Sequence, residues 1–285
     1  MKIGLIGHGA WGRNHARVLR ELGALGAVYD DDPRALQACP QVVNSMAQIL
    51  DDVTIAGVVI ATPPATHYRI ARLALTAGKH VLIEKPMCTT VEDAEDLEAL
   101  AVQFNRVLMV GHLMMYHGGY ALLKQASLGF GVLEYAYSHR LQPGRVQTDI
   151  SCLWSLAPHD VSMLIGIMGM PQRASCTTGV LRGRVADIIT AQFEFAAGAR
   201  GHMFISWLHP KKHREFGVIG SKDGLVMCQD SVVEPLKVEL AEFIACIETG
   251  RRSPLGTDAA QGINVVKVLT ACDDSIKEDG AWITL

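Results

Sequence analysis

A glycine-rich turn near the N-terminus restricts the fold of this chain more than any other feature of its sequence. Residues 7–12 read Gly-His-Gly-Ala-Trp-Gly; they follow an apolar run at residues 2–6 and open a helical pattern at 11–21. The glycines of GxGxxG permit a tight turn, let a pyrophosphate approach the backbone, and let the helix pack closely on the strand. The N–H groups that begin the helix offer an anion site. The turn therefore predicts a dinucleotide-binding Rossmann domain.

Asp30 follows the last glycine of this turn by 18 residues and comes directly after the next apolar run, residues 24–29. A carboxylate at this point accepts hydrogen bonds from the adenine ribose hydroxyls and repels a 2′-phosphate, so we expect NAD as cofactor in preference to NADP. A structural glycine turn followed by an incidental acid is the alternative interpretation. The predicted cofactor-binding residues of this segment are Gly7, His8, Gly9, Ala10, Trp11, Gly12 and Asp30.

The hydrophobic pattern divides the chain into two halves. Over about the first 110 residues, apolar runs alternate with amphipathic stretches, which indicates βαβ units and a parallel sheet. After about residue 116, strand patterns follow one another across short turns, which indicates a mostly antiparallel sheet. The predicted strands are residues 2–6, 24–29, 57–61, 80–83, 107–110, 131–139, 174–181, 187–195, 201–207 and 215–219; the predicted helices are 11–21, 67–77, 89–105, 159–168, 236–248 and 258–277.

We therefore expect an α/β chain with two domains. Residues 1–116 are expected to form the Rossmann domain, a doubly wound parallel sheet that binds the dinucleotide. Residues 117–285 are expected to form an α+β domain with a large, mostly antiparallel open sheet, which binds the substrate and mediates oligomerisation.

Composition excludes several classes of function. Apolar residues make up 49% of the chain and charged residues 19%, which is enough for a large core. The net charge of −3 gives no reason to expect a nucleic acid or an anionic membrane as partner. There is no signal-peptide pattern and no apolar run of about 18 residues, so we expect a cytoplasmic protein. Seven scattered cysteines without a CxxC pair are typical of reduced thiols, and no metal site is expected from them.

Two further segments follow predicted strands at the edge where ligands bind in open α/β sheets. Thr62, Pro63 and His67 belong to the run that follows the third strand, and we expect this run to face the cofactor; a plain helix start capped by Thr66 is the alternative. Glu84-Lys85-Pro86 follows the fourth strand. The lysine is expected to point into the cleft, and the X-Pro bond after it can be cis.

These motifs occur in an order and spacing that resemble the Gfo/Idh/MocA family of sugar and cyclitol oxidoreductases. The resemblance covers essentially the whole chain. It implies that Glu84 belongs to the cofactor site, that Lys85 lies near the nicotinamide, and that His159 completes the catalytic pair. Many members of the family carry Asp or Asn four residues before that histidine, whereas this chain has Ser155. The departure leaves open whether Lys85 or His159 is the general base.

The segment from residue 137 to residue 160 resembles a branch of the family that acts in nucleotide-sugar metabolism and includes UDP-N-acetylglucosamine 3-dehydrogenases. Guanidinium groups match phosphate oxygens, so Arg140 and Arg145 are candidates for contact with a diphosphate; exposed strand-end charges are the alternative. Interdomain packing is the alternative role for His112, Tyr116 and His117. The candidate substrate-binding residues are His112, Tyr116, Arg140, Arg145, Trp154, Ser155 and Asp160, with His117 beside them.

The resemblance implies hydride transfer from a sugar carbon to NAD, with C3 of a UDP-N-acetylhexosamine as the expected position. Two alternatives remain: a dehydrogenase of free sugars or cyclitols, and a catalytically silent NAD-binding regulator. Exposure of the open sheet would leave a large apolar patch, so we expect a homodimer or homotetramer formed through this sheet.

Overall fold

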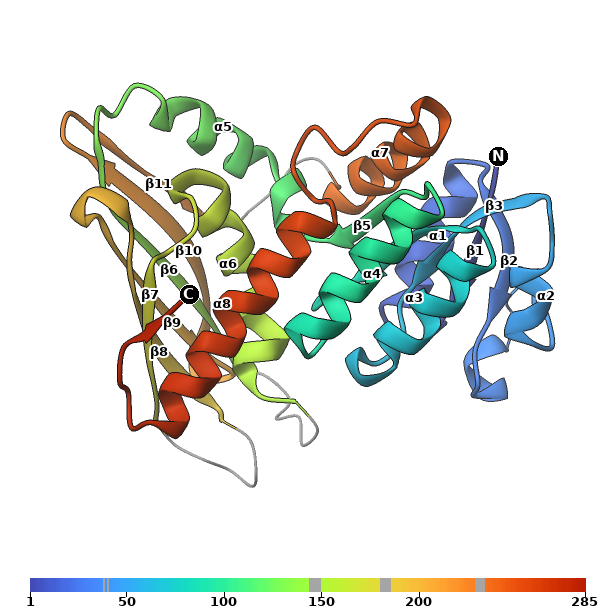
Figure 1. The fold of residues 1–285 in the computed structure, drawn as a ribbon, viewed down its shortest axis with the longest axis horizontal. Helices are drawn as coiled ribbons and strands as arrows, with labels where there is room; N and C mark the ends of the chain where they lie inside the picture. The colour runs from blue at the N-terminus through green and yellow to red at the C-terminus, as the bar shows by residue number, and fades with distance from the viewer. Residues whose placement is uncertain (38, 40, 144–149, 180–185, 229–233) are drawn as a thin grey trace. The chain divides into compact units, whose positions relative to one another are not determined.

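The computed structural model describes residues 1–37, 39, 41–143, 150–179, 186–228 and 234–285, so the predicted diphosphate residue Arg145 lies outside the described residues. The chain divides into two compact units (Figure 1). The first unit contains Met1–His112 and Leu236–Ile263, and the second contains Leu113–Pro235 and Asn264–Leu285. This division differs from the predicted one because residues 236–263 return to the first unit.

The first unit is built on a parallel sheet with the strand order β2-β1-β3-β4-β5. Its strands are β1 (Lys2–Ile6), β2 (Leu25–Tyr29), β3 (Ile55–Ile60), β4 (His80–Glu84) and β5 (Leu108–Gly111). An isolated parallel bridge between Val28 and Val42 extends the sheet beyond β2. With this bridge the order matches the complete six-strand Rossmann order 3-2-1-4-5-6, in which the chain leaves neighbouring strands β1 and β3 in opposite directions.

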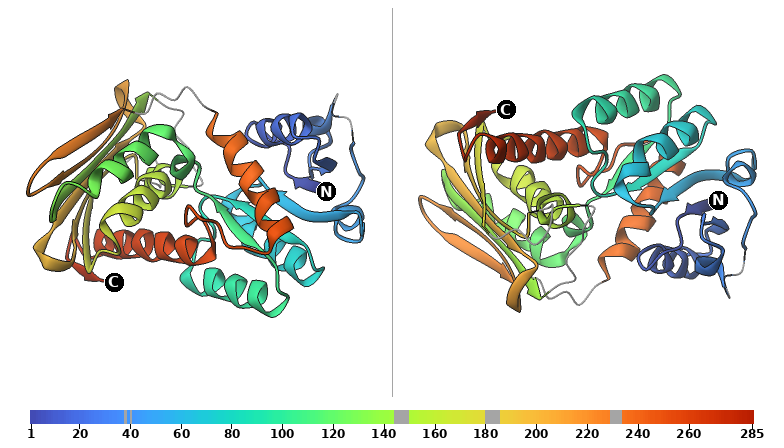
Figure 2. Two further views of the ribbon diagram at one scale, coloured as in Figure 1. Left: turned by 90° about the horizontal axis from the view of Figure 1, so that it is seen from above. Right: turned by 90° about the horizontal axis from the view of Figure 1, so that it is seen from below.

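Helices cover both faces of this sheet, so the predicted doubly wound arrangement is confirmed (Figure 2). Helices α1 (Gly12–Glu21) and α7 (Pro235–Thr249) share one face, and an ion pair between Lys237 and Glu21 joins them. Helices α3 (His67–Thr76) and α4 (Val91–Gln103) lie on the other face. The single-turn helix α2 (Met46–Leu50), which begins with a capping box at Ser45, was not predicted.

The returning segment also covers the edge strand of the first unit. The Val110 amide donates to the Thr257 carbonyl oxygen at 2.8 Å, and Met109 forms an antiparallel bridge with Asp258. An edge strand presents unpaired backbone groups, and these contacts satisfy some of them on β5.

The second unit contains a seven-stranded sheet with the order β11-β10-β6-β9-β8-β7-β12. Its strands are β6 (Leu133–Pro143), β7 (Arg173–Thr178), β8 (Ile188–Glu194), β9 (Arg200–Ser206), β10 (Leu208–Gly220), β11 (Gly224–Cys228) and β12 (Ile283–Thr284). Among the described pairs only β6 and β9 are parallel, so the predicted mostly antiparallel sheet is confirmed.

All longer helices of the second unit lie on one face of its sheet (Figure 2). They are α5 (Gly118–Ser127), α6 (Cys152–Met168) and α8 (Ala259–Lys277), of which α8 begins in the first unit. Side chains alternate along β6: Ser138 and Arg140 face the helices and are buried, whereas Tyr137 and His139 point to the opposite side and are half-buried. We call this opposite side the open face of the sheet.

Helix α6 begins seven residues before its predicted start at His159. Its first turn is capped by Ser151, whose hydroxyl accepts from the Trp154 amide. Pro158 lies inside this helix, which is buried along most of its length. Ser155 and His159 are therefore four residues apart on one helix and share a face. Within the described part of the chain, no helix has the length and apolar character needed to cross a membrane.

Candidate dinucleotide and substrate site

A cavity of about 680 Å³ opens beyond the carboxyl ends of β1 and β3 in the first unit. This is the position where α/β sheets of this topology bind ligands. The lining includes four predicted residues of the glycine turn, the predicted Asp30, and two predicted residues of the run after β3. These predicted residues are Gly7, Gly9, Ala10, Trp11, Asp30, Thr62 and Pro63.

The geometry of the glycine turn explains its three glycines separately. Gly7 has a φ of +96°, and a Cβ there would lie 2.7 Å from the backbone of Ala61. A Cβ on Gly12 would lie 2.1 Å from the Gly7 carbonyl oxygen, so only glycine lets α1 approach β1 this closely. A Cβ on Gly9 would meet no protein atom within 4 Å. Packing within the protein therefore does not require glycine at position 9, whereas the close approach of a pyrophosphate does. The turn thus fits a dinucleotide.

Asp30 lies at the rim of this cavity with its carboxylate held by the backbone. Oδ2 accepts from the His8 amide at 2.6 Å, and Oδ1 accepts from the Asp32 amide at 2.8 Å. Asp31 and Asp32 also line the cavity, so its ribose end is acidic, although an exposed Arg69 lies nearby. The His8 side chain is buried and donates from Nδ1 to the Ala35 carbonyl oxygen at 2.7 Å, so His8 contributes its backbone rather than its ring.

Glu84 connects the end of β4 with the start of α1. Its Oε1 accepts from His15 Nε2 at 2.7 Å and from the Trp11 indole N–H, and its Oε2 accepts from the Lys85 amide at 3.2 Å. Burial alone raises the pKa of Glu84, but the hydrogen bond and charge of His15, the Lys85 charge and the Trp11 hydrogen bond outweigh it. The pKa of Glu84 therefore falls below its ordinary value, and the carboxylate stays ionised.

The segment after Glu84 places Lys85 at the carboxyl end of β4, where its side chain is half-buried. The Lys85–Pro86 peptide is cis, in agreement with the sequence-based hypothesis. His67 is fully buried, with Nδ1 at 2.8 Å from the Pro86 carbonyl oxygen and Nε2 at 2.9 Å from the Thr62 carbonyl oxygen. Its ring therefore ties the two loops together and does not line the cavity.

Two more titratable groups are completely buried near Glu84. His112 follows β5, and burial lowers its pKa to about 4, so its ring is neutral.

Glu239 on α7 was not predicted as a site residue. Burial, followed by the charges of Glu84 and Glu242, raises its pKa well above the ordinary value. Neither carboxyl oxygen of Glu239 has a hydrogen-bond partner among the described residues. The sequence signal was an acid within the buried stripe formed by Leu236, Leu240 and Phe243.

In the second unit, the N-terminal half of α6 carries several predicted substrate residues. Asp160 is buried and forms an ion pair with Arg140, and its Oδ1 also accepts from the Ser138 hydroxyl at 2.5 Å. Arg140 is only 2% exposed, so its guanidinium is committed to Asp160. This ion pair fixes α6 on β6 and argues against the diphosphate contact predicted for Arg140.

The remaining predicted residues of this unit have diverse surroundings. The Trp154 indole N–H donates to Asp273 Oδ2 on α8 at 2.5 Å. Tyr116 is buried in the short 3₁₀ turn Leu113–Tyr116, and His117 caps α5 through a hydrogen bond that its Nδ1 accepts from the Gly119 amide at 3.1 Å. Ser155 and His159 are half-buried.

Arg214 is a candidate anion ligand that the sequence analysis missed. It pairs with Arg140 across β10 and β6, so both side chains belong to the helix-covered face. Its Nη2 donates to Gln142 Oε1 at 3.0 Å, and its Nε is buried without a hydrogen-bond partner among the described residues. Burial and then the Arg140 charge lower the pKa of Arg214, while Asp160 raises it. The guanidinium is half-buried, and no ion pair joins it to a carboxylate in the described part of the chain.

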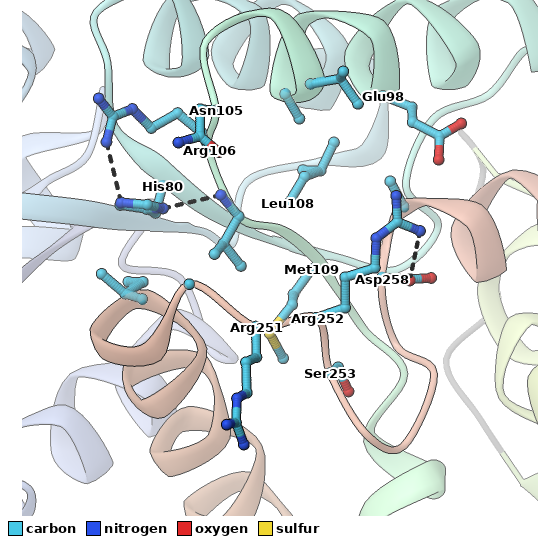
Figure 3. Close-up of a pocket in the computed structure, with 16 residues that line it drawn as sticks. His80, Glu98, Asn105, Arg106, Leu108, Met109, Arg251, Arg252, Ser253 and Asp258 are labelled. Carbon is cyan, nitrogen blue, oxygen red and sulfur yellow. Dashed lines mark hydrogen bonds and ion pairs between the residues drawn. The ribbon is translucent and has the colours of Figure 1, made fainter.

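A second cavity of about 470 Å³ lies at the other end of the parallel sheet, where β4 and β5 begin (Figure 3). His80 and Arg106 lie together on one side, and Arg252 faces Asp258 on another. None of the residues predicted to bind cofactor or substrate lines this cavity. It is therefore separate from the dinucleotide site.

Comparison with known proteins matches both parts of the chain to one family. Residues 1–112 match the "Oxidoreductase family, NAD-binding Rossmann fold" and residues 119–226 match the "GFO/IDH/MocA C-terminal domain". The UDP-N-acetylglucosamine 3-dehydrogenase of Acidithiobacillus ferrooxidans is 27% identical over 93% of this chain and 94% of its own length. The scyllo-inositol 2-dehydrogenase (NADP(+)) IolW of Bacillus subtilis is 21% identical over 84% of this chain and 81% of its own length.

A solved structure shares the complete fold. The WlbA dehydrogenase of Bordetella pertussis, in complex with NADH and UDP-GlcNAcA, superposes with a TM-score of 0.89 at 22% identity, covering 100% of this chain and 98% of that one. The cavity beside the glycine turn agrees with the NAD-binding Rossmann fold that the first family match describes. The chain thus belongs to the Gfo/Idh/MocA family and is one of its NAD-binding oxidoreductases.

Proposed function

We propose that this protein oxidises a sugar hydroxyl to a ketone and that its substrate is a UDP-N-acetylhexosamine oxidised at C3. The observation that carries the proposal is the likeness to a UDP-N-acetylglucosamine 3-dehydrogenase over nearly the whole length of both chains. The resemblance of residues 137–160 to the nucleotide-sugar branch supports the same substrate class.

The first unit supplies the binding groups for NAD, which accepts the hydride when bound. The glycine turn and the N-terminus of α1 would hold the pyrophosphate, and Asp30 would accept from the adenine ribose hydroxyls. Glu84 fixes the Trp11 side chain at the cavity wall through the indole hydrogen bond. These groups bind and orient the cofactor, while the redox chemistry belongs to the cofactor itself.

Lys85 and His159 are the proposed acid–base residues. A sugar hydroxyl is a very weak acid, so removal of its proton needs a positioned acceptor, and such groups contribute roughly 10²–10⁴-fold to rates. Lys85 can accept this proton when neutral, or stabilise the developing alkoxide as a cation. His159 can orient the hydroxyl or share the proton. Ser155 carries no carboxylate, so the Asp–His pair of many relatives has no counterpart at this position.

We assign the diphosphate contact to Arg214 in place of Arg140. The Arg214 guanidinium has no carboxylate partner among the described residues, so its charge and its N–H donors are available to a phosphate. The Arg140 guanidinium is already paired with Asp160. We also keep Arg145 as a proposed contact of the diphosphate.

The test is NADH formation with NAD and matched pairs of substrates, measured by absorbance with a ketone trap to pull the reaction forward. Turnover with UDP-N-acetylglucosamine but not with free N-acetylglucosamine supports the proposal. Arg214→Gln should then raise KM for the UDP-sugar about tenfold or more, a loss of about 1.4 kcal/mol, and leave KM for NAD unchanged. The exposed Arg173→Gln is the matched control. Equal turnover of both sugars would contradict the UDP assignment.

A cyclitol dehydrogenase is the second candidate function, because the inositol dehydrogenase of Bacillus subtilis matches most of this chain. Inositols have no diphosphate, so Arg214→Gln would not change their KM. Turnover of inositols, with none of UDP-sugars, would establish this second function and reject the first.

We also propose that the protein is a homodimer or homotetramer formed through the open face of the seven-stranded sheet. No helix of the second unit covers this face among the described residues, and Ile219 on β10 and Val226 on β11 are 43% and 45% exposed on it. Light scattering after gel filtration should give a dimer or tetramer mass, and Ile219→Asp should shift the protein towards the monomer. A monodisperse wild-type monomer at micromolar concentration would overturn this proposal.

A further inference from the structure

Three side chains of metal-ligand type meet on the open face of the second unit. His139 on β6 and His213 and Glu215 on β10 each offer a ligand atom, and these atoms all lie within 4.8 Å of one another. Strand pairing explains the meeting. Glu215 is directly opposite His139 in the β6–β10 register, and His213 precedes Glu215 by two residues, so all three side chains project from the same face.

A third imidazole lies beside this group. His202 on β9 pairs with Tyr137 and is therefore diagonal to His139, with the two Nε2 atoms 3.2 Å apart. On the other side, His213 Nε2 lies 3.4 Å from Glu215 Oε2. Neighbouring ligand atoms of a tetrahedral zinc ion bound at about 2.0–2.1 Å are roughly 3.3 Å apart. The pair His139–His202 and the pair His213–Glu215 already have about this separation.

The cluster also contains an orienting partner. The Tyr135 hydroxyl is hydrogen-bonded to His202 Nδ1. If Nδ1 carries the proton and donates it to the hydroxyl oxygen, the lone pair of Nε2 points towards His139. Histidines that bind metals usually donate their second ring N–H to such an acceptor, which fixes the tautomer and the ring orientation.

We propose that His139, His213 and Glu215 form a binding site for a divalent transition-metal ion of the zinc type, and that His202, which lies beside His139 but outside the group of atoms within 4.8 Å of one another, completes it as fourth ligand through a side-chain movement. Imidazole nitrogens with one carboxylate suit Zn²⁺ and its neighbours Co²⁺ and Ni²⁺, whereas Mg²⁺ and Ca²⁺ prefer oxygen ligands. The site belongs to the sheet of the second unit and uses none of the residues assigned to NAD or to the sugar. It is a structural or self-association site on the open face.

The test uses full-length protein purified without a histidine tag. Titration with Co²⁺ should give the intense visible absorption of tetrahedral cobalt at one equivalent per chain, and Zn²⁺ should displace it. His213→Gln and Glu215→Gln should each weaken Zn²⁺ binding by at least about tenfold, and Tyr135→Phe by about ten- to a hundredfold. His209→Gln is the matched control, because this histidine lies on the same strand with its Nδ1 2.7 Å from the Lys211 carbonyl oxygen.

Thermal unfolding followed by circular dichroism, measured on every variant, shows that the second unit still folds, and NAD binding shows that the first unit is intact. Binding that is lost in His213→Gln and Glu215→Gln but retained in His209→Gln supports the site. Absence of stoichiometric Co²⁺ binding would overturn the proposal. So would weak absorption typical of octahedral cobalt, or equal losses in His209→Gln and His213→Gln, because both indicate ordinary surface histidines.

Discussion

Glu84 and His15 form a hydrogen bond of 2.7 Å between a fully buried imidazole and a carboxylate whose pKa burial alone would raise. The bond joins the end of β4 to the middle of α1, the helix that begins with the glycine turn. It therefore links the segment that carries Lys85 to the segment that would bind the pyrophosphate. Glu84 is therefore a positioning residue for Lys85 and for the glycine turn.

Glu84→Gln should lower the free energy of unfolding by about 1.5–3 kcal/mol at pH 7, because a hydrogen bond to a charged group contributes about this much. The folded pKa of Glu84 lies below its ordinary value of 4.5, so its contribution is present above pH 4.5 and is lost as the pH falls through the folded pKa. Urea titrations should therefore show the variant and the wild type converging in acid. Glu98→Gln on α4 is the control, and a similar loss in both variants would argue against a special role for Glu84.

Asp30→Ala should reduce the preference for NAD over NADP by about tenfold or more, equivalent to about 1.4 kcal/mol. The carboxylate repels a 2′-phosphate, and its removal also frees the His8 and Asp32 amides as donors. The measurement is kcat/KM with each cofactor at saturating sugar. Asp31→Ala is the informative comparison, since Asp31 lines the same cavity. A larger change in cofactor preference in Asp31→Ala would mean that Asp31, rather than Asp30, contacts the adenine ribose.

Lys85→Met should reduce turnover by roughly 10²–10⁴-fold, the usual contribution of a positioned acid or base. The methionine keeps the length of the side chain and removes only its charge and protons. NAD affinity, measured by fluorescence titration, should change little, which separates catalysis from cofactor binding. The exposed Lys124→Met on α5 controls for loss of a surface charge. Unchanged turnover in Lys85→Met would remove the lysine from the mechanism.

Local signals were sufficient to predict most of the fold. The glycine turn, the two periodicities and the short turns identified both sheets, because each signal depends on neighbouring residues alone. The start of α6 was misplaced because proline is unusual inside a helix, while the packing that keeps residues 152–158 helical depends on distant strands. The return of residues 236–263 to the first unit left no local signal either, since it depends on pairing with β5 and packing beside α1.

Parts of the candidate site were predictable for the same reason. Gly7, Gly9 and Asp30 belong to one sequence motif with a characteristic spacing, and they line one cavity. Arg140 was misinterpreted because its partner Asp160 lies 20 residues away and the pair forms only when α6 packs on β6. Arg214 was missed for the converse reason: nothing near it in sequence shows that it lacks an acidic partner.

Glu239 provides a prediction about pH and stability that rests on a buried acid. Its folded pKa is raised well above 4.5, because burial and then the charges of Glu84 and Glu242 favour the neutral carboxyl group. A raised folded pKa means that the stabilising contribution is complete below pH 4.5 and is lost as the pH rises towards the folded pKa. Within that window the wild type should lose about 1.4 kcal/mol of stability per pH unit through this group.

Glu239→Gln removes this titration and keeps the shape of the side chain. The free energy of unfolding of the variant relative to the wild type should therefore increase as the pH rises from 4.5 towards the folded pKa of Glu239, although the buried amide still lacks a partner and lowers the whole curve by about 1–3 kcal/mol. Glu242→Gln on the same helix is the control, because the Glu242 charge is one of the groups that raise the pKa of Glu239. Its curve should change by less and in the same direction. Parallel curves for Glu239→Gln and the wild type would mean that Glu239 is ionised and has a cationic partner in solution.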